Sequence, residues 1–130
     1  MAVLAEAVSR AVAQVYAERF DLSRDEWRVL AALAQVGRMK MVRLVEHTTL
    51  DKMQVSRAVA RLEHDGLLAR ETDPEDRRGW LLQLTSAGRA LHRKIVPMVE
   101  AREAFLLESL DPQERAALDA AFDKVLARAR

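Results

Sequence analysis

The sequence carries the same helix-start signal three times. In this signal, the capping box, a short polar side chain accepts a hydrogen bond from the backbone N–H three residues later, and a Glu or Gln at that position bonds back. The pairs are Ser23 with Glu26, Asp51 with Gln54, and Asp111 with Glu114. These starts constrain the chain to a mainly helical fold, and its four Gly and three Pro are too few for the many turns of an all-β fold.

Apolar spacing and cap residues predict the remaining elements. Two short segments of β-capable residues flank the charged sequence Pro74 to Arg78, which predicts a hairpin. Thr85 can cap the long helix that begins at Ser86, and Pro97 should kink that helix because proline removes one backbone hydrogen bond. The predicted elements are helices over about 1–20, 23–35, 42–47, 51–64, 86–106 and from 112 onward, with strands over 67–73 and 79–85.

The helix predicted from Asp51 to His64 separates into two faces. At about 100° per residue, one face is apolar and should pack on the core, whereas the other is polar and displayed. The packing face consists of Val55, Ala58, Val59 and Leu62, and the displayed face of Met53, Ser56, Arg57, Ala60 and Arg61, with Gln54 at its edge. Arg, Gln and Ser side chains can contact bases or phosphates of DNA. This helix follows another across a four-residue turn, so it is a candidate recognition helix of a helix-turn-helix.

Local charge separates this interpretation from the plainer one, in which the two Arg of the displayed face are only a solvated surface. The whole chain has 21 Lys and Arg against 20 Asp and Glu, a formal net charge of +1, which indicates nothing about a nucleic-acid partner. From Lys40 to Arg61, however, five basic residues stand against two acidic ones, a net of +3. The hairpin tip adds Arg77 and Arg78, which can enter a minor groove, and Asp76 can orient a neighbouring Arg.

In this arrangement the sequence resembles the MarR family of winged-helix transcription regulators over nearly its whole length. The segments that carry the resemblance are Asp51 to Val59, Leu62-Glu63 with Gly66-Leu67-Leu68, Arg70 to Arg78, and Leu84 to Gly88. The resemblance implies a mainly α fold with a small β-hairpin wing, an α+β winged helix-turn-helix. Residues 21–87 would form the DNA-binding region, and residues 1–20 with 88–130 the helical dimerisation region, within one compact domain. Lys40 stands at the start of the third helix, where the family usually has Ser or Thr.

The resemblance also implies a function, sequence-specific binding of double-stranded DNA by a transcriptional regulator. The expected protein is a homodimeric repressor that binds a pseudo-palindromic operator and is released by a small-molecule effector, such as an aromatic acid or its coenzyme A thioester. We expect DNA contacts from Lys40, Lys52, Met53, Gln54, Ser56, Arg57, Arg61, Asp76, Arg77 and Arg78. Candidates for effector contact are Tyr16, Trp27 and Arg28, although large aromatic side chains more often belong to a core or an interface.

Composition and motifs exclude several other functions. The chain has no Cys, which excludes thiol chemistry, including the thiol-based peroxide sensing found in one branch of the family. The three His, at 47, 64 and 92, lack the spacing of a metal site and are expected at the surface or at helix ends, so we expect neither metal nor cofactor. No phosphate loop or nucleophile motif indicates an enzyme. The alternative from another class is a helical protein–protein adaptor whose basic face binds an acidic partner.

The expected location is the cytoplasm, without a membrane partner. The longest uncharged run, Gly79 to Gly88, has ten residues, whereas a membrane-spanning helix needs about twenty apolar residues. Glu6 and Arg10 interrupt the apolar residues near the N-terminus, so no secretion signal is recognisable there.

Overall fold

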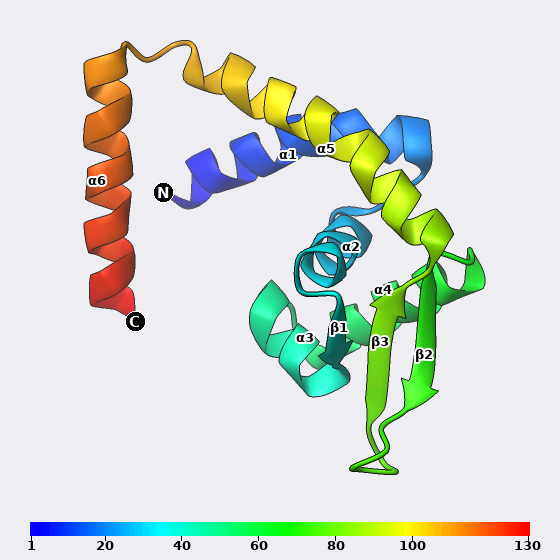
Figure 1. Cartoon of the computed structure of the whole chain (residues 1–130). Coiled ribbons are helices and arrows are strands. Elements are labelled where there is room, and N and C mark those ends of the chain that lie inside the picture. Colours follow the sequence, from blue (N-terminus) through cyan, green and yellow to red (C-terminus); the bar gives the residue numbers. More distant parts are fainter.

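The computed structural model describes all 130 residues and confirms the predicted fold class, a mainly helical chain with a small β wing. The elements are α1 (Ala2–Phe20), α2 (Arg24–Val36), β1 (Arg38–Lys40), α3 (Met41–Thr48), α4 (Lys52–His64), β2 (Leu68–Thr72), β3 (Trp80–Leu84), α5 (Ser86–Leu107) and α6 (Pro112–Ala129). Helices α1 and α5 lie together on one side of the molecule, and the hairpin of β2 and β3 projects from the opposite side (Figure 1).

All three predicted capping boxes form, and they set the starts of α2, α4 and α6. The capping oxygens accept from the backbone N–H groups of Glu26 at 3.1 Å, Gln54 at 2.8 Å and Glu114 at 2.8 Å. Helix α3 begins after Lys40, whose side chain does not cap it. Helix α5 continues through Pro97 without a break, and the kink expected there stays a prediction.

The hairpin belongs to a three-stranded antiparallel sheet in the order β1-β3-β2. Leu82, in the middle of β3, lies opposite Met39 on β1 and opposite Arg70 on β2. The third strand, β1, was not predicted, because three residues are too few to show an alternating pattern. It forms because β3 would otherwise present an edge of unpaired backbone groups. Met39 points into the core, whereas its neighbours Arg38 and Lys40 are exposed.

The hydrophobic core lies between α2, the apolar face of α4 and the sheet. The predicted packing face of α4 is confirmed, because Val55, Ala58, Val59 and Leu62 are all buried. The largest fully buried side chains are Leu30 and Leu33 of α2, Leu44 of α3, Leu62 of α4, Leu82 of β3 and Ile95 of α5. This core fixes the direction of α4, so its opposite face is turned to solvent.

The start of α5 is joined closely to the turn between α4 and β2. The Thr85 hydroxyl donates to the carbonyl of Gly66 at 2.7 Å, and the Thr85 N–H donates to the carbonyl of Leu67 at 3.0 Å. A Cβ atom on Gly88 would stand 2.0 Å from the Leu67 carbonyl oxygen. The absence of a side chain at Gly88 is therefore what lets the long helix approach the winged region.

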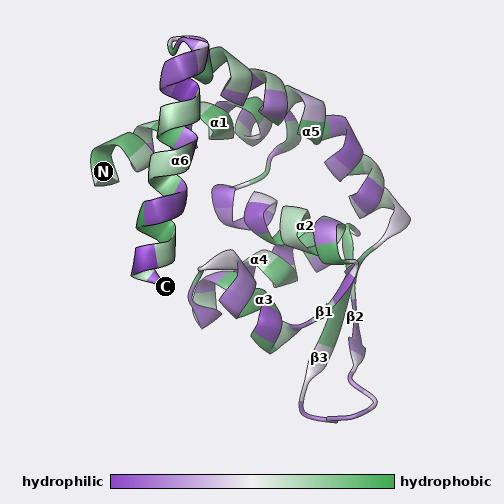
Figure 2. Cartoon of the chain, turned by 60° about the vertical axis from the view of Figure 1, so that its left-hand side comes forward, coloured by the Kyte–Doolittle hydropathy of each residue, from purple (hydrophilic) through white to green (hydrophobic).

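The two ends of the chain display large apolar side chains. No residue of α6 is buried, and this helix stands at the left of Figure 1, beyond the N-terminus of α1. Hydrophobic residues, coloured green, recur along α6 and α1 in Figure 2. The exposed large apolar residues of the terminal helices are Met1, Val3, Leu4, Val8, Phe105, Phe122, Val125 and Leu126. On α6 the exposed residues Phe122, Val125 and Leu126 form an apolar stripe. Such a stripe usually packs against a partner.

Candidate nucleic-acid interface

The displayed face of α4 has the composition that the sequence predicted. Five side chains are exposed along it, and Gln54 lies half-buried at its edge. The exposed residues are Met53, Ser56, Arg57, Ala60 and Arg61. The Asp51 capping box sets the first turn of this helix and with it the direction of Lys52 and Met53. The face therefore combines cationic, polar and small side chains on a rigid element.

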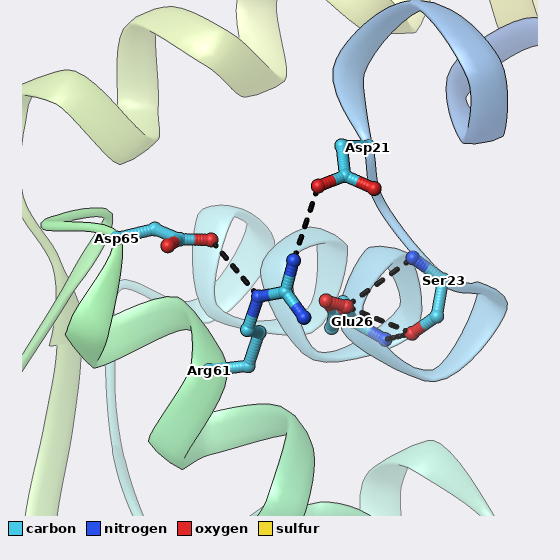
Figure 3. Close-up of polar contacts among 5 residues, drawn as sticks. All are labelled: Asp21, Ser23, Glu26, Arg61 and Asp65. Atoms are coloured by element: carbon cyan, nitrogen blue, oxygen red, sulfur yellow. Dashed lines mark hydrogen bonds and ion pairs between the residues drawn. The ribbon is translucent and has the colours of Figure 1, made fainter.

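The three cations of α4 differ in their partners. Lys52 and Arg57 are exposed and make no ion pair. Arg61 instead lies between two carboxylates, with its Nη2 3.1 Å from Oδ2 of Asp21 and its Nε 3.4 Å from Oδ2 of Asp65 (Figure 3). Asp21 belongs to the turn between α1 and α2, far from α4 in the sequence, so sequence reasoning missed this pairing.

Lys40 lies under the wing loop and not on the surface of α4. Its Nζ is 3.3 Å from Oδ2 of Asp73 and 3.8 Å from Oε2 of Glu75. The Asp73 side chain is buried, and its Oδ1 accepts from the Glu75 N–H at 2.9 Å. This backbone hydrogen bond, together with Lys40, holds the pKa of Asp73 below its usual range. Lys40 thus links β1 to the base of the wing loop through these ion pairs. The sequence predicted Lys40 as a DNA contact and did not predict this pairing.

The tip of the wing presents two unpaired cations. Arg77 and Arg78 are exposed in the loop between β2 and β3 and make no ion pair. The loop appears as a hydrophilic extension in Figure 2. Asp76 accepts from the backbone N–H of Arg78 at 3.1 Å, so it orders the backbone of the loop and does not bind an Arg side chain.

A second set of contacts fixes the wing relative to the candidate recognition helix. Arg70 of β2 donates from Nε to Oε2 of Glu63 on α4 at 3.0 Å. The same guanidinium lies over the ring of Trp80 on β3, 5.2 Å from the ring centroid. The wing and α4 are therefore held as one unit.

The three candidate effector residues line one cavity. This cavity, of about 500 Å³, lies between α1, α2, α5 and α6. Tyr16, Trp27 and Arg28 border it together with apolar residues that include Val12 and Phe122. Arg28 is the cation of this lining, and Glu103 is its acid. The arrangement suits a small apolar molecule that carries an anionic group.

His92 is a residue of this region that sequence reasoning did not connect with the cavity. The rings of Tyr16 and Trp27 are stacked at 5.3 Å between centroids, and those of Trp27 and His92 at 5.5 Å. Burial lowers the pKa of His92 and raises the pKa of the Tyr16 hydroxyl. The stack joins α1, α2 and α5 behind the cavity, and only the folded chain brings these rings together.

The largest cavity, of about 710 Å³, lies elsewhere, between the end of α2, β1, α3 and β3. Its lining includes Arg38, Lys40 and Arg43. Each of these cations already has an acidic partner: Glu71 for Arg38, Asp73 for Lys40 and Glu46 for Arg43. The cationic charge of this lining is therefore balanced by acidic side chains in the same part of the fold.

Two further properties concern metals and membranes. No three His, Asp or Glu side chains lie close enough together to hold a metal ion. None of the helices combines the length and the apolar character needed to cross a bilayer.

Comparison with known proteins identifies relatives for this fold and sequence. The sequence model of the MarR family matches residues 20–79. The transcriptional regulator HosA of Escherichia coli O111:H- is 28% identical over 95 residues, which span 73% of this chain and 70% of HosA. BpsR of Bordetella bronchiseptica, whose DNA binding is regulated by 6-hydroxynicotinic acid, is 34% identical, with a TM-score of 0.80 over 95% of this chain and 89% of that one.

A third similar protein was solved on DNA. A mutant of MarR from E. coli, complexed with operator DNA, has a TM-score of 0.85 and 25% identity and covers 95% of this chain and 89% of its own. The two structural matches each cover 95% of this chain, so they extend beyond the winged region into both terminal helices. With its winged-helix sheet, its helix-turn-helix and these relatives, the chain belongs to the MarR family of transcriptional regulators.

Proposed function

We propose that the protein is a homodimeric repressor that binds a pseudo-palindromic operator and is released by a small aromatic acid or its coenzyme A thioester. The observation that carries the proposal is the exposed face of α4, where a packed apolar side turns Lys52, Ser56 and Arg57 outward. A regulator of transcription works on the chromosome, so we place the protein in the cytoplasm.

On DNA, the winged region of residues 21–87 makes the contacts. Two α4 helices enter successive major grooves about 34 to 36 Å apart, one from each subunit. The residues proposed to contact bases or phosphates there are Lys52, Met53, Gln54, Ser56, Arg57 and Arg61. Arg77 and Arg78 reach the flanking minor grooves, where a narrow groove attracts Arg. Asp76 and Lys40 support the wing through the contacts described above.

The terminal helices form the dimer in this proposal. Residues 1–20 and 88–130 carry the exposed apolar side chains of α1, α5 and α6, and a second copy of the chain would cover them. The side chains include Phe105 and Phe122, whose burial contributes much to an interface. Dimerisation also sets the spacing of the two α4 helices, which is why both halves of an operator can be read at once.

The effector site in this proposal is the cavity bordered by Tyr16, Trp27 and Arg28. Aromatic rings offer stacking to a planar ligand, and the Arg28 guanidinium can pair with its carboxylate. The regulation of BpsR by 6-hydroxynicotinic acid, an aromatic acid, supports this ligand class. The cavity is bordered by α1 and α6 as well as α2, so its occupant can bias the position of the dimer helices relative to the winged region.

Sequencing of the genomic DNA that copurifies with the protein tests the central claim. We expect enrichment of one pseudo-palindromic sequence, footprinting of both half-sites, and derepression of a reporter that carries this sequence when the protein is deleted. Binding to duplex DNA should weaken steeply with salt, because several phosphate contacts release counterions. Recovery of random DNA, or binding only to an acidic protein, would favour the adaptor function instead.

A further inference from the structure

Arg61 differs from the other cations of α4 because two carboxylates neutralise it. Asp21 and Asp65 lie on either side of its guanidinium, at 3.1 and 3.4 Å (Figure 3). One Arg with two Asp gives this cluster a net charge of −1. Arg57, four residues earlier on the same exposed face, has no acidic partner. The surface of α4 therefore offers one free guanidinium and one that is already bound.

Asp21 owes its position to an unusual backbone conformation. It ends α1 with φ 52° and ψ 44°, the left-handed region that Asn and Asp tolerate better than most residues. This conformation accounts for a short polar residue at position 21, but Asn would serve equally well. The backbone conformation therefore does not require a negative charge at position 21. The carboxylate has a separate effect, which is to bind Arg61.

The pair between Asp21 and Arg61 is easily exchanged. The Asp21 side chain is 89% exposed and that of Arg61 is 52% exposed, so water and salt screen their attraction. A duplex, by contrast, carries one negative charge for about every 1.7 Å of its axis. A phosphate brought to this surface by Lys52 and Arg57 is therefore a stronger partner for Arg61 than an isolated, solvated carboxylate.

Arg57 and Arg61 also border one recess at the surface, where one phosphate could contact both. A cavity of about 320 Å³ lies between the start of α2 and α4. It is bordered on one side by Ser23, Asp25 and Glu26, and on the other by Gln54, Arg57, Ala58 and Arg61, so two arginines face two carboxylates across it. Both arginines thus face one recess beside the exposed surface of α4, and Arg61 borders the recess while it is still bound to Asp21.

We propose that Asp21 competes with a DNA phosphate for Arg61 and so lowers the affinity of the protein for DNA. The inference rests on the proposed DNA binding. In the free protein Arg61 is paired with Asp21. On a duplex, a phosphate in the recess between α2 and α4 takes the guanidinium, and Asp21 is left unpaired close to the DNA backbone. Asp21 thereby weakens binding by holding Arg61, which must leave its ion pair before it can contact phosphate.

The variant that tests this is Asp21→Asn, which removes the charge and keeps a residue suited to the left-handed turn. Its matched control is Glu18→Gln, because Glu18 is exposed near the same end of α1 and makes no ion pair. Both changes are also made together with Arg61→Gln. The probe is a random-sequence duplex of about 30 base pairs, long enough for both half-sites of a dimer, since phosphate contacts do not depend on base sequence. The dissociation constant is measured between about 50 and 200 mM salt.

We expect Asp21→Asn to tighten binding about threefold to tenfold more than Glu18→Gln does, with nearly the same salt slope, because Arg61 contacts phosphate on the duplex in both proteins. With Arg61→Gln present, the advantage over the control should disappear. Equal effects of Asp21→Asn and Glu18→Gln, a gain that survives Arg61→Gln, or weaker binding by a folded Asp21→Asn protein would each overturn the inference. Failure of the unmodified protein to bind any duplex would instead overturn the proposed function.

Discussion

Arg78 is an exposed cation at the wing tip without an acidic partner, so its side chain is free to contact DNA. We expect Arg78→Ala to weaken operator binding about tenfold, or about 1.4 kcal/mol, without changing the unfolding temperature. Arg93→Ala removes the same charge from the exposed surface of α5 and should change affinity little. A DNA titration at fixed salt compares the two variants. Equal losses would indicate that only net charge matters and that the wing makes no contact.

His92 should make stability depend on pH. Burial lowers the pKa of His92, so the folded protein binds the proton less readily than the unfolded chain, whose His titrates near pH 6.5. Above about pH 6.5 the ring is neutral in both the folded and the unfolded chain, so its stacking contributes fully to the free energy of unfolding. Below that value stability falls, by at most about 1.4 kcal/mol per pH unit for one proton, and the fall levels off beneath the folded pKa.

The comparison of His92→Phe with the wild-type protein measures this contribution. Phe keeps an aromatic ring in the stack and removes the titration, so its free energy of unfolding in urea should fall less between about pH 7.5 and 5.5. The same change at the exposed His64, which is not part of the stack, is the matched control. If His92→Phe and the wild-type protein lose stability in parallel, His92 is not the group responsible.

At the residue scale, the exposed face of α4 could be predicted from the sequence, but the ion pairs of Lys40 and Arg61 could not. The exposed face of α4 could be predicted from spacing alone, because Val55 and Val59 are four residues apart and so lie on one side of the helix, with polar residues on the other. The partners of Lys40 and Arg61 did not follow, because Asp73 and Asp21 come from distant segments that only the folded chain brings near. Local pattern determines direction, whereas ion pairs between elements depend on tertiary structure.

Among the elements, the start of α5 is the least tolerant of added volume. Gly88→Ala would place a methyl group 2.0 Å from the carbonyl oxygen of Leu67. Ala normally stabilises a helix relative to Gly. Here the clash must push the start of α5 away from the turn between α4 and β2, to which the Thr85 hydroxyl is hydrogen-bonded. We expect a loss of about 1–3 kcal/mol in the free energy of unfolding.

A second glycine serves as the control for this prediction. A Cβ on Gly79 would meet atoms no closer than 3.5 Å, which is ordinary contact. Gly79→Ala should therefore leave thermal unfolding nearly unchanged. If Gly88→Ala is as stable as Gly79→Ala, the joint between α5 and the winged region is looser than its geometry indicates.

The elements differ in how much of each one was visible in the sequence. Helices α2, α4 and α6 carry their own capping boxes, so local residues determine where they start. Strand β1 carries no local signal, because it consists of Arg38, Met39 and Lys40 and exists through its pairing with β3. The stacked rings of Tyr16, Trp27 and His92 likewise come from three helices, so the residues behind the cavity could not all be predicted.

At the scale of the whole molecule, DNA affinity should depend on two subunits docking together, because the net charge of +1 provides little general attraction. Phe122 is 46% exposed within the apolar stripe of α6. We expect Phe122→Glu to yield a monomer that binds the operator at least tenfold more weakly, since each half-site alone offers fewer contacts. Sedimentation velocity and a DNA titration measure the two effects.

Lys124→Glu is the control, because Lys124 lies off the apolar stripe of the same helix and is also exposed. It should remain a dimer with affinity reduced only by the change in charge. A Phe122→Glu protein that sediments as a dimer would show that another surface joins the subunits.

The last helix has a consequence for how the protein responds to its own abundance. Phe122 of α6 borders the cavity, yet no residue of α6 is buried within its own chain. If a second copy holds α6 in place, dilution releases this helix, and the cavity loses part of its wall at the same moment that the paired α4 helices separate. The concentration of the protein would then affect regulation as well as the effector does. At low concentration the protein would lose both its affinity for DNA and part of the wall of its effector cavity.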